Sequence, residues 1–281
     1  MKIRSLKLAC FSPTGTTYAV LQGIARGIGV TGELVDVTTP DARKSPLVAG
    51  GDDLLLLGVP VYMGRVPALL SEWFGRLDLR RTPTVCVVVY GNRAYENALR
   101  ELTDLVSARG GFPFAAAAFI GEHSFSSVDL PASVGRPDAS DLSLAEDFGR
   151  RIEADLRSVA GFEPGAELAV PGSFPYGGIT ELWDVDFIQV GERCTQCGAC
   201  AARCPTGAIE PGNSAAIDTA KCITCCACIK SCPQQARTKK PGPVLDASRR
   251  IHANYAEPKA PELFFISESD VPPRCTPEAD G

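Results

Sequence analysis

Nine of the twelve cysteines in this chain fall between Cys194 and Cys232, and they lie in two repeats. The segment CTQCGACAARCPTGAI, which starts at Cys194, aligns with CITCCACIKSCPQQAR, which starts at Cys222, 28 residues later. Each repeat follows the pattern CxxCxxCxxxCP. Disulfide frameworks are typical of small secreted chains, whereas cysteines this dense in one part of a 281-residue chain indicate metal ligation in a reducing compartment. Two zinc ribbons are the alternative, but ribbons use paired CxxC units.

The doubled pattern is typical of bacterial ferredoxins with two 4Fe-4S clusters, in which the fourth cysteine of each repeat binds the other repeat's cluster. Thiolates suit iron-sulfur clusters because they are soft donors. The predicted ligands of one cluster are Cys194, Cys197, Cys200 and Cys232. The predicted ligands of the other cluster are Cys222, Cys225, Cys228 and Cys204. Cys226 lies one position out of the pattern and stays an alternative ligand.

The first 160 residues alternate apolar runs with amphipathic segments. Runs such as LLLLGV and VCVVVY suit parallel strands that are covered on both faces. They predict strands at 3–11, 33–39, 53–62, 84–91 and 113–121. With helices between them, these strands predict a five-stranded parallel, doubly wound α/β sheet whose ligand site lies at the carboxyl ends of the strands. The predicted domains are this sheet at 1–160, a linker at 161–189, a small α+β cluster domain at 190–240 and a tail at 241–281.

The stretch FSPTGTT joins the first predicted strand to a helix. A phosphate could be held there by backbone N–H groups at the helix N-terminus and by short hydroxyls. The spacing SxTGxT resembles the phosphate loop of flavodoxins, which bind FMN, at Ser12, Thr14, Gly15, Thr16 and Thr17. The GKS or GKT ending of a P-loop is missing, and an ordinary helix N-cap is the alternative. A second motif, GxGxxG from Gly27, leads from a helix into a strand and is therefore predicted to be a turn.

Three further loops are expected at the same edge of the sheet: PVYMGRVP, YGNRAYEN and GEHSFS. They offer aromatic, polar and glycine groups that could contact a flavin ring. The candidate residues are Tyr62, Met63, Gly64, Gly91, Asn92, Arg93, Tyr95, His123, Ser124 and Phe125. Packing roles for Tyr62 and Tyr95, and a simple polar loop role for His123, remain alternatives.

Taken together, SPTGTT, GVPVYMGRVP, VVVYGNRAYENAL, GEHSFS, GRPD and the doubled cysteine pattern resemble a family of flavodoxin and ferredoxin fusion proteins of anaerobic bacteria and archaea. The resemblance implies a flavodoxin-like N-terminal domain with FMN and a C-terminal ferredoxin domain with two clusters. It carries the phosphate role to the SPTGTT loop and the isoalloxazine contacts to the loops around Tyr62, Asn92 and His123. Thr16 departs from the family pattern, because many flavodoxins have Asn there. Cys226 also departs from it, since a bulkier apolar residue is usual.

These features predict an electron-transfer protein that passes electrons between the clusters and FMN, and on to a redox partner protein. Two alternatives are a flavin-dependent reductase of a small organic substrate, held under the long segment 126–141, and a redox sensor. The net charge of −5 argues against nucleic-acid binding. No apolar run reaches the roughly 18 residues of a membrane span, and no secretory signal is visible, so a cytoplasmic location is expected.

Charge is distributed unevenly along the chain. Residues 190–240 carry a net charge of +4, and the rest of the chain carries −9. The opposite charges predict that the cluster domain docks on the flavodoxin-like domain, with an inconsequential solvated face as the alternative.

Overall fold

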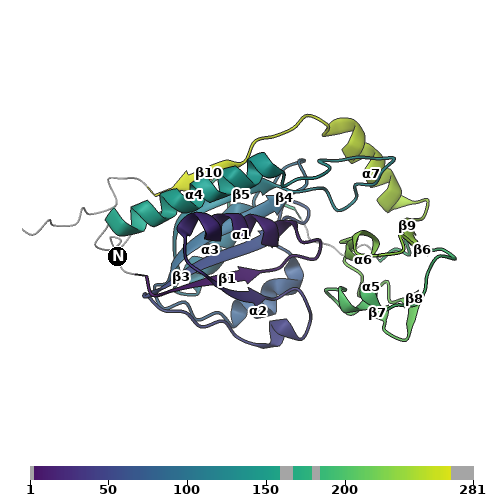
Figure 1. The fold of residues 1–281 in the computed structure, drawn as a ribbon, viewed down its shortest axis with the longest axis horizontal. Coiled ribbons are helices and arrows are strands. Elements are labelled where there is room, and N and C mark those ends of the chain that lie inside the picture. Colours follow the sequence, from purple (N-terminus) through teal and green to yellow (C-terminus); the bar gives the residue numbers. More distant parts are fainter. Residues whose placement is uncertain (1–2, 159–166, 179–183, 267–281) are drawn as a thin grey trace, which may run out of the picture.

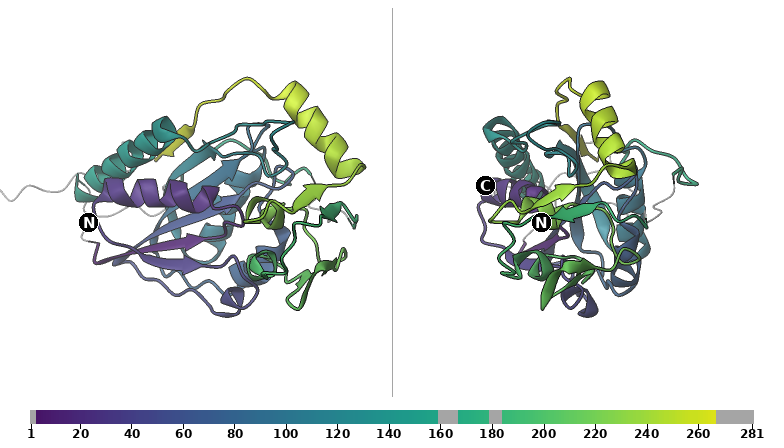
Figure 2. Two further views of the ribbon diagram at one scale, coloured as in Figure 1. Left: turned by 45° about the vertical axis from the view of Figure 1, so that its right-hand side comes forward. Right: turned by 90° about the vertical axis from the view of Figure 1, so that its right-hand side faces the viewer.

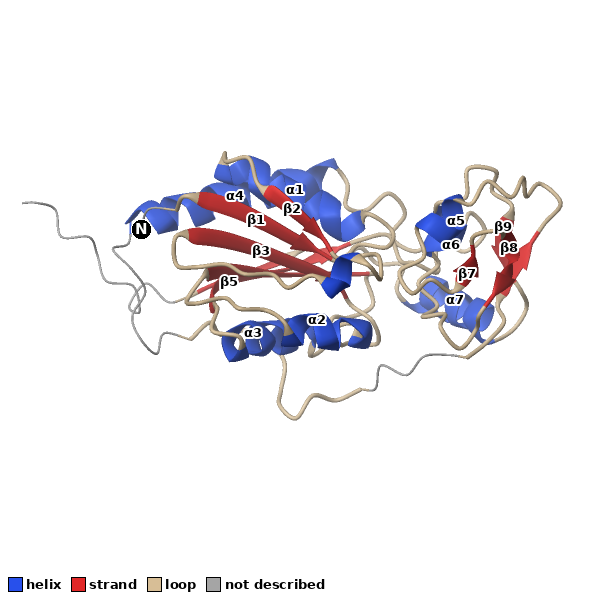
Figure 3. Cartoon of the chain, turned by 90° about the horizontal axis from the view of Figure 1, so that it is seen from below, coloured by secondary structure: helices blue, strands red, loops and turns tan. Residues whose placement is uncertain are grey.

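The computed structural model describes residues 3–158, 167–178 and 184–266. A sheet with helices on both faces forms one end of the molecule, and the short elements of the cysteine-rich segment form the other (Figure 1, Figure 3). Parts of the predicted linker and tail, including Cys275, lie outside the described residues.

Five parallel strands form most of the main sheet. They lie in the order β2-β1-β3-β4-β5, which is the flavodoxin-like order of a doubly wound fold. The strands are β1 (Ser5–Cys10), β2 (Glu33–Asp36), β3 (Asp53–Pro60), β4 (Pro83–Tyr90) and β5 (Phe112–Ile120). Each one overlaps a predicted strand, so the predicted fold class is confirmed.

A sixth strand, β10 (Glu262–Phe265), comes from the tail and was not predicted. It pairs antiparallel with β5, with Leu263 opposite Ala117. An antiparallel edge on a parallel sheet is common in such folds. Figure 2 shows the chain running back from the far end of the molecule to reach this edge. The tail is therefore part of the sheet.

Helices cover both faces of the sheet (Figure 3). One face carries α1 (Thr16–Ile28) and α4 (Ala139–Ser158), and the other carries α2 (Ser71–Gly75) and α3 (Ala98–Ala108). Apolar residues from Val66 to Leu77 recur at helical spacing, which predicts a helix, but there α2 is only five residues long and follows a 3-10 turn at Ala68–Leu70. A second 3-10 turn, Ala42–Lys44, lies between β2 and β3. Buried apolar side chains pack on both faces, with Trp73 on one and Phe148 on the other.

Two glycines allow α1 and α4 to pack closely. A Cβ at Gly27 would overlap the carbonyl oxygen of Glu146, and one at Gly149 would overlap that of Ile24. Gly29 then ends α1 with a φ of 76°. The GxGxxG motif is therefore a helix end and turn, as predicted.

The cysteine-rich segment, residues 184–240, consists of short elements. Two helices, α5 (Ala199–Ala202) and α6 (Ala227–Lys230), accompany the strand pairs β6 (Ile188–Val190) with β9 (Arg237–Lys239) and β7 (Ile209–Glu210) with β8 (Asn213–Ile217). The helix α7 (Pro243–Asn254) follows and opens the tail segment, residues 241–266. None of the helices within the described ranges is long and apolar enough to cross a membrane.

The backbone repeats the sequence repeat. Positive φ values occur at Gln196, Gly198 and Gly207 in the first half, and at the positions 28 residues later in the second half, Thr224, Cys226 and Gln235. The two halves therefore share one local fold.

We expect Gly27→Ala to destabilise the protein although alanine is the better helix former, because the added methyl group collides with the backbone of α4. The free energy of unfolding should fall by roughly 2–4 kcal/mol in urea titrations. Gly75→Ala is the matched control, since a Cβ there meets open space, and it should change stability by less than about 0.5 kcal/mol. Equal stability of the two variants would contradict the close helix packing.

Candidate functional site

The loop between β1 and α1 contains a buried hydroxyl with no partner. Thr17 is 1% exposed, and its Oγ1 makes no hydrogen bond. Gly15, with a φ of 88°, stands at the N-cap of α1 without a side-chain cap. Ser12 Oγ accepts a hydrogen bond from the Tyr18 N–H at 3.1 Å. An unpaired buried hydroxyl is costly, so its position here fits a bound oxygen-rich group such as a phosphate.

This loop lines a hollow at the carboxyl ends of the parallel strands, which we call the loop hollow. Its lining comprises Ser12, Pro13, Thr14, Thr16 and Thr17, together with residues 60–62 after β3, residues 89–91 at the end of β4 and residues 121–124 after β5. A Cβ at Gly91 would overlap the ring of His123, so glycine is needed there. The expected meeting of these loops at one edge is confirmed.

A larger cavity of about 460 Å³ adjoins the loop hollow, and we call it the junction cavity. The two share Val61, Tyr62, His123 and Ser124. Other predicted residues in its lining are Met63, Arg93 and Phe125. The remaining walls were not predicted. They come from Ala68 and Leu69 of the 3-10 turn, from residues 223–225 of the cysteine-rich segment and from residues 247–255 of the tail segment. Three parts of the chain therefore enclose one cavity.

Two residues predicted to contact a cofactor hold the tail segment instead. The amide of Asn92 donates to the carbonyl oxygens of Tyr255 and Glu257, both at 2.8 Å, and its Oδ1 accepts from the Lys259 N–H at 3.1 Å. The hydroxyl of Tyr95 donates to Glu262 at 2.9 Å. Neither side chain lines the loop hollow or the junction cavity.

The two remaining predicted residues are Gly15 and Gly64. Neither belongs to the lining of the loop hollow or the junction cavity. Gly64 has a φ of 78°, and a Cβ there would overlap the carboxylate of Glu96. Its role in the structure is therefore a tight turn.

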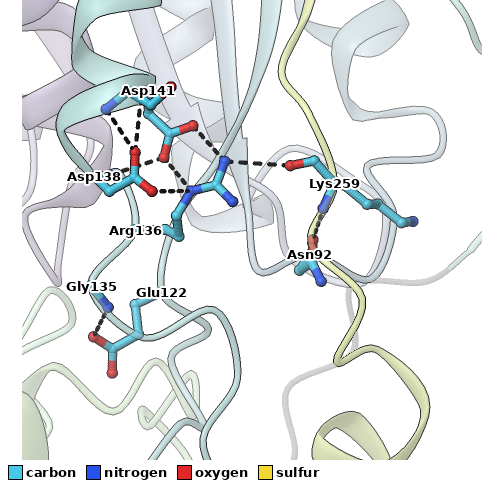
Figure 4. A network of polar contacts seen from close by, with 8 residues as sticks. Asn92, Glu122, Gly135, Arg136, Asp138, Asp141 and Lys259 are labelled. Atoms are coloured by element: carbon cyan, nitrogen blue, oxygen red, sulfur yellow. Dashed lines mark hydrogen bonds and ion pairs between the residues drawn. The ribbon is translucent and has the colours of Figure 1, made fainter.

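The segment after β5 is held by a network around Arg136 (Figure 4). The guanidinium pairs with the buried carboxylate of Asp141 at the start of α4, and it also donates to the Lys259 carbonyl at 3.3 Å. Asp138 accepts from the Asp141 N–H at 3.0 Å. The long segment 126–141 is thus anchored to both α4 and the tail segment.

His123 lies in the lining of both the loop hollow and the junction cavity. Burial lowers the pKa of His123 to about 4, and the positive charges of Lys239, Lys230 and Arg93 act in the same direction. Its Nδ1 accepts a hydrogen bond from the Phe125 N–H at 3.0 Å, so the neutral ring carries its proton on Nε2. The side chain is therefore a neutral hydrogen-bond donor.

Basic residues of the cysteine-rich segment contact the loop after β5. Lys230 forms an ion pair with Glu122, and Lys239 donates to the carbonyl oxygen of Phe125. Burial raises the pKa of Glu122, but the Lys230 ammonium, together with hydrogen bonds from the Gly135 N–H and the Ser126 hydroxyl, outweighs burial, so the pKa lies below its ordinary value. Lys240 pairs instead with Asp186 of its own segment. Of the lysines in these contacts, Lys230 alone pairs with an acidic side chain of the flavodoxin-like sheet region, whereas Lys239 contacts a neutral carbonyl oxygen.

The predicted cluster ligands surround two separate hollows. The first cysteine hollow is lined by Cys194, Cys197, Cys200 and Cys232. The second cysteine hollow is lined by Cys204, Cys222, Cys225, Cys226 and Cys228. Each hollow thus contains the four in-pattern cysteines of one predicted ligand set, and four thiolates are the donor set of a 4Fe-4S cluster. The ligand assignment itself stays a prediction. In the part of the chain that the structure describes, no three His, Cys, Asp or Glu side chains gather closely enough for a single metal ion.

Backbone N–H groups contact equivalent sulfur atoms in the two halves. Ala208 donates to Cys204 Sγ at 3.2 Å, and Ala236 donates to Cys232 Sγ at 3.3 Å. Hydrogen bonds of this kind stabilise a ligating thiolate.

Cys226 occupies a backbone position that favours glycine. Its φ is 55°, and the equivalent residue of the first half is Gly198, with a φ of 74°. The side chain is buried, and its thiol lies 3.7 Å from the carbonyl oxygen of Thr224. Its backbone therefore differs in kind from that of the in-pattern cysteines, which are not among the described residues with positive φ.

Comparisons with known proteins found one family model and several solved structures that are similar to parts of this chain. A family model for a 4Fe-4S binding domain matches residues 190–210. No curated protein matches the chain. The chain is similar to a flavodoxin from the domain Archaea, with 12% identity and a TM-score of 0.38 over 56% of this chain and 99% of that chain.

Two further solved structures resemble the same region. The two-electron reduced flavodoxin of Megasphaera elsdenii has 16% identity and a TM-score of 0.33, over 50% of this chain and 97% of that chain. Rubredoxin oxygen:oxidoreductase from Desulfovibrio gigas has 9% identity and a TM-score of 0.36, over 56% of this chain and 36% of that chain. The fold assignment itself rests on the strand order. The chain joins a flavodoxin-like sheet to a 4Fe-4S binding segment.

The lowered pKa of His123 makes stability depend on pH. Between pH 6.5 and about 4 the unfolded chain binds more protons than the folded one, so stability is lost as the pH falls through this window. Between pH 7.5 and pH 5.5 the contribution of His123 to the free energy of unfolding should fall by roughly 1 kcal/mol, measured by urea unfolding.

The variant His123→Gln should lose this part of the pH dependence. His252→Gln is the matched control, because it removes the chain's only other histidine, and it should keep that part. An unchanged pH profile in His123→Gln would show that the folded protein does not hold this ring neutral.

Proposed function

We propose that the protein transfers electrons between two 4Fe-4S clusters and FMN, and exchanges them with a redox partner protein. The observation that carries this proposal is the position of Cys225, which lines both the second cysteine hollow and the junction cavity beside Tyr62 and Met63. Clusters exchange single electrons and a flavin exchanges one or two, so the pair can couple both kinds of transfer. In this proposal residues 1–160 form the flavin domain, 190–240 form the cluster domain, and 241–281 form a tail that joins them.

Several features of the loop hollow and the junction cavity support FMN as the flavin. In the proposal, the Thr17 hydroxyl and the N–H groups at the start of α1 bind the phosphate. Tyr62, Met63 and Phe125 would border the ring, and His123 would donate a hydrogen bond from Nε2. The volume of about 460 Å³ lies within the range of small-molecule sites.

Tyr62 lies close enough to the predicted cluster ligands to interact with them electrostatically. Burial raises the pKa of Tyr62 well above its ordinary value, and the nearby thiols of Cys225 and Cys226 add to this effect. The phenol therefore stays neutral, and it lies between the flavin loops and the second cysteine hollow. This arrangement supports a short path between the two cofactors.

Exposure suggests where a partner protein would dock. Cys197, in the first cysteine hollow, is exposed, whereas Cys225 and Cys228 of the second are buried. The first cysteine hollow shares no lining residue with the junction cavity. We therefore propose that electrons pass between the partner and the outer cluster, held by Cys194, Cys197, Cys200 and Cys232, and then through the inner cluster to the flavin.

A second candidate function is the reduction of a small organic substrate. The specific observation is that α7 closes the junction cavity with Arg250, Ile251 and Asn254. Together with Arg93, the cavity has two cationic side chains and no acidic one in its lining. Reoxidation of the reduced protein by a small anionic molecule without any partner protein would favour this function.

The phosphate assignment is tested by Thr17→Val, which removes the unpaired hydroxyl and keeps the shape. We expect the Kd for FMN to rise about tenfold, since a hydrogen bond to a charged group is lost. The Kd for riboflavin, which lacks the phosphate, should not change. Calorimetric titration of the flavin-free protein measures both.

The matched control is Thr103→Val. Thr103 is a buried threonine of α3 that bonds the Arg100 carbonyl oxygen at 2.8 Å, remote from the loop hollow. It should keep its FMN affinity. Equal weakening of FMN and riboflavin in Thr17→Val would place the phosphate elsewhere.

The electron path is tested by comparing Cys225→Ala with Cys226→Gly. The wild-type protein, purified anaerobically, should contain about eight iron atoms. Cys225→Ala should drop to about four, and a reduced ferredoxin should then reduce its bound flavin much more slowly. Cys226→Gly should keep both the iron and the rate. Fast flavin reduction in Cys225→Ala would overturn the proposed path.

A further inference from the structure

A buried arginine lies beside the first cysteine hollow. Arg237 is 3% exposed, and among the described residues its side chain makes one hydrogen bond, from Nη2 to the carbonyl oxygen of Ser214. Its Nη1 is buried and has no partner. Arg237 also forms no ion pair with an acidic side chain in the described ranges. Burying a guanidinium without a carboxylate is costly, so a negatively charged group is expected next to it.

The hydroxyl of Ser214 resembles Nη1 of Arg237, because its Oγ is buried and has no hydrogen-bond partner. Both residues line the first cysteine hollow together with its four cysteines. Two unpaired donors thus border the space that the proposed function assigns to the outer cluster.

Comparison with the first half of the repeat shows that the charge is specific to one hollow. The position equivalent to Arg237, 28 residues earlier, is Ile209. Ile209 is equally buried, at 4% exposed, and it lines the second cysteine hollow. One hollow therefore has a cation where the other has an aliphatic side chain.

We propose that Arg237 and Ser214 donate hydrogen bonds to sulfur atoms of the outer cluster and hold its reduction potential above that of the inner cluster. This inference rests on the two clusters of the proposed function. Reduction adds one electron, and so one negative charge, to a cluster. A buried cation and N–H or O–H donors stabilise that charge. The electron then resides preferentially on the outer cluster, beside the exposed Cys197.

Arg237 and Ser214 line the first cysteine hollow and do not line the second. Coulomb interactions weaken with distance, so the charge of Arg237 acts less strongly on the inner cluster. A larger effect on the outer cluster follows.

The test is a potentiometric titration of the full, cluster-loaded protein, followed by electron paramagnetic resonance. In Arg237→Met the reduced-to-oxidised ratio of one cluster at a fixed potential should fall about tenfold, which is about 59 mV for one electron. The other cluster should shift less. Arg237→Lys keeps the charge and should restore most of the potential. Ser214→Ala should lower the same cluster's ratio by a smaller factor.

Arg193→Met is the matched control, since it removes the same charge from an exposed side chain next to Cys194. It should leave both potentials unchanged. Unchanged potentials in Arg237→Met, or an equal shift in Arg193→Met, overturn the inference. If Arg237→Met does not load its clusters, an unchanged potential in loaded Ser214→Ala overturns it instead. Iron content and flavin reduction of the wild type test the proposed function separately.

Discussion

The ammonium of Lys239 joins the cysteine-rich segment to the loop after β5 and to the helix α7. Lys239 belongs to β9 of the cysteine-rich segment, and it donates to Phe125 after β5 and to Ser248 of α7 at 2.7 Å. Burial lowers the pKa of Lys239, so its charged form depends on these partners. The junction cavity exists only because these three segments meet. Its shape, and the approach of Cys225 to Tyr62, depend on this contact.

The tail segment is the second element that fixes the two halves to each other. It leaves the cysteine-rich segment as α7, closes the junction cavity, and ends as a strand of the main sheet. Asn92 and Arg136 bind its backbone on the way. Because the tail segment ties the cysteine-rich segment to the sheet, folding sets how far the second cysteine hollow lies from the loop hollow.

The parts of the structure that depend on local spacing could be predicted from the sequence. The strands follow from apolar runs, and the two cysteine sets follow from ligand spacing within each repeat. Asn92 and Tyr95 could not be placed, because their partners lie more than 160 residues away. The part of the junction cavity that α7 lines could not be predicted either, since the sequence of a short amphipathic helix does not indicate which surface the helix will cover. The sequence does contain a signal for Arg237: the equivalent position of the first repeat is the uncharged Ile209. A charged residue in only one of two repeats indicates a role that is specific to that half.

The position of β10 gives the chain an order of assembly. Protein synthesis proceeds from the N-terminus, and early segments generally fold first. The sixth strand of the sheet is made only after all eight in-pattern cysteines have been made. The ribosome therefore releases all eight in-pattern cysteines before the sheet can acquire its last edge. Cluster insertion can thus precede the closure of the molecule around the junction cavity.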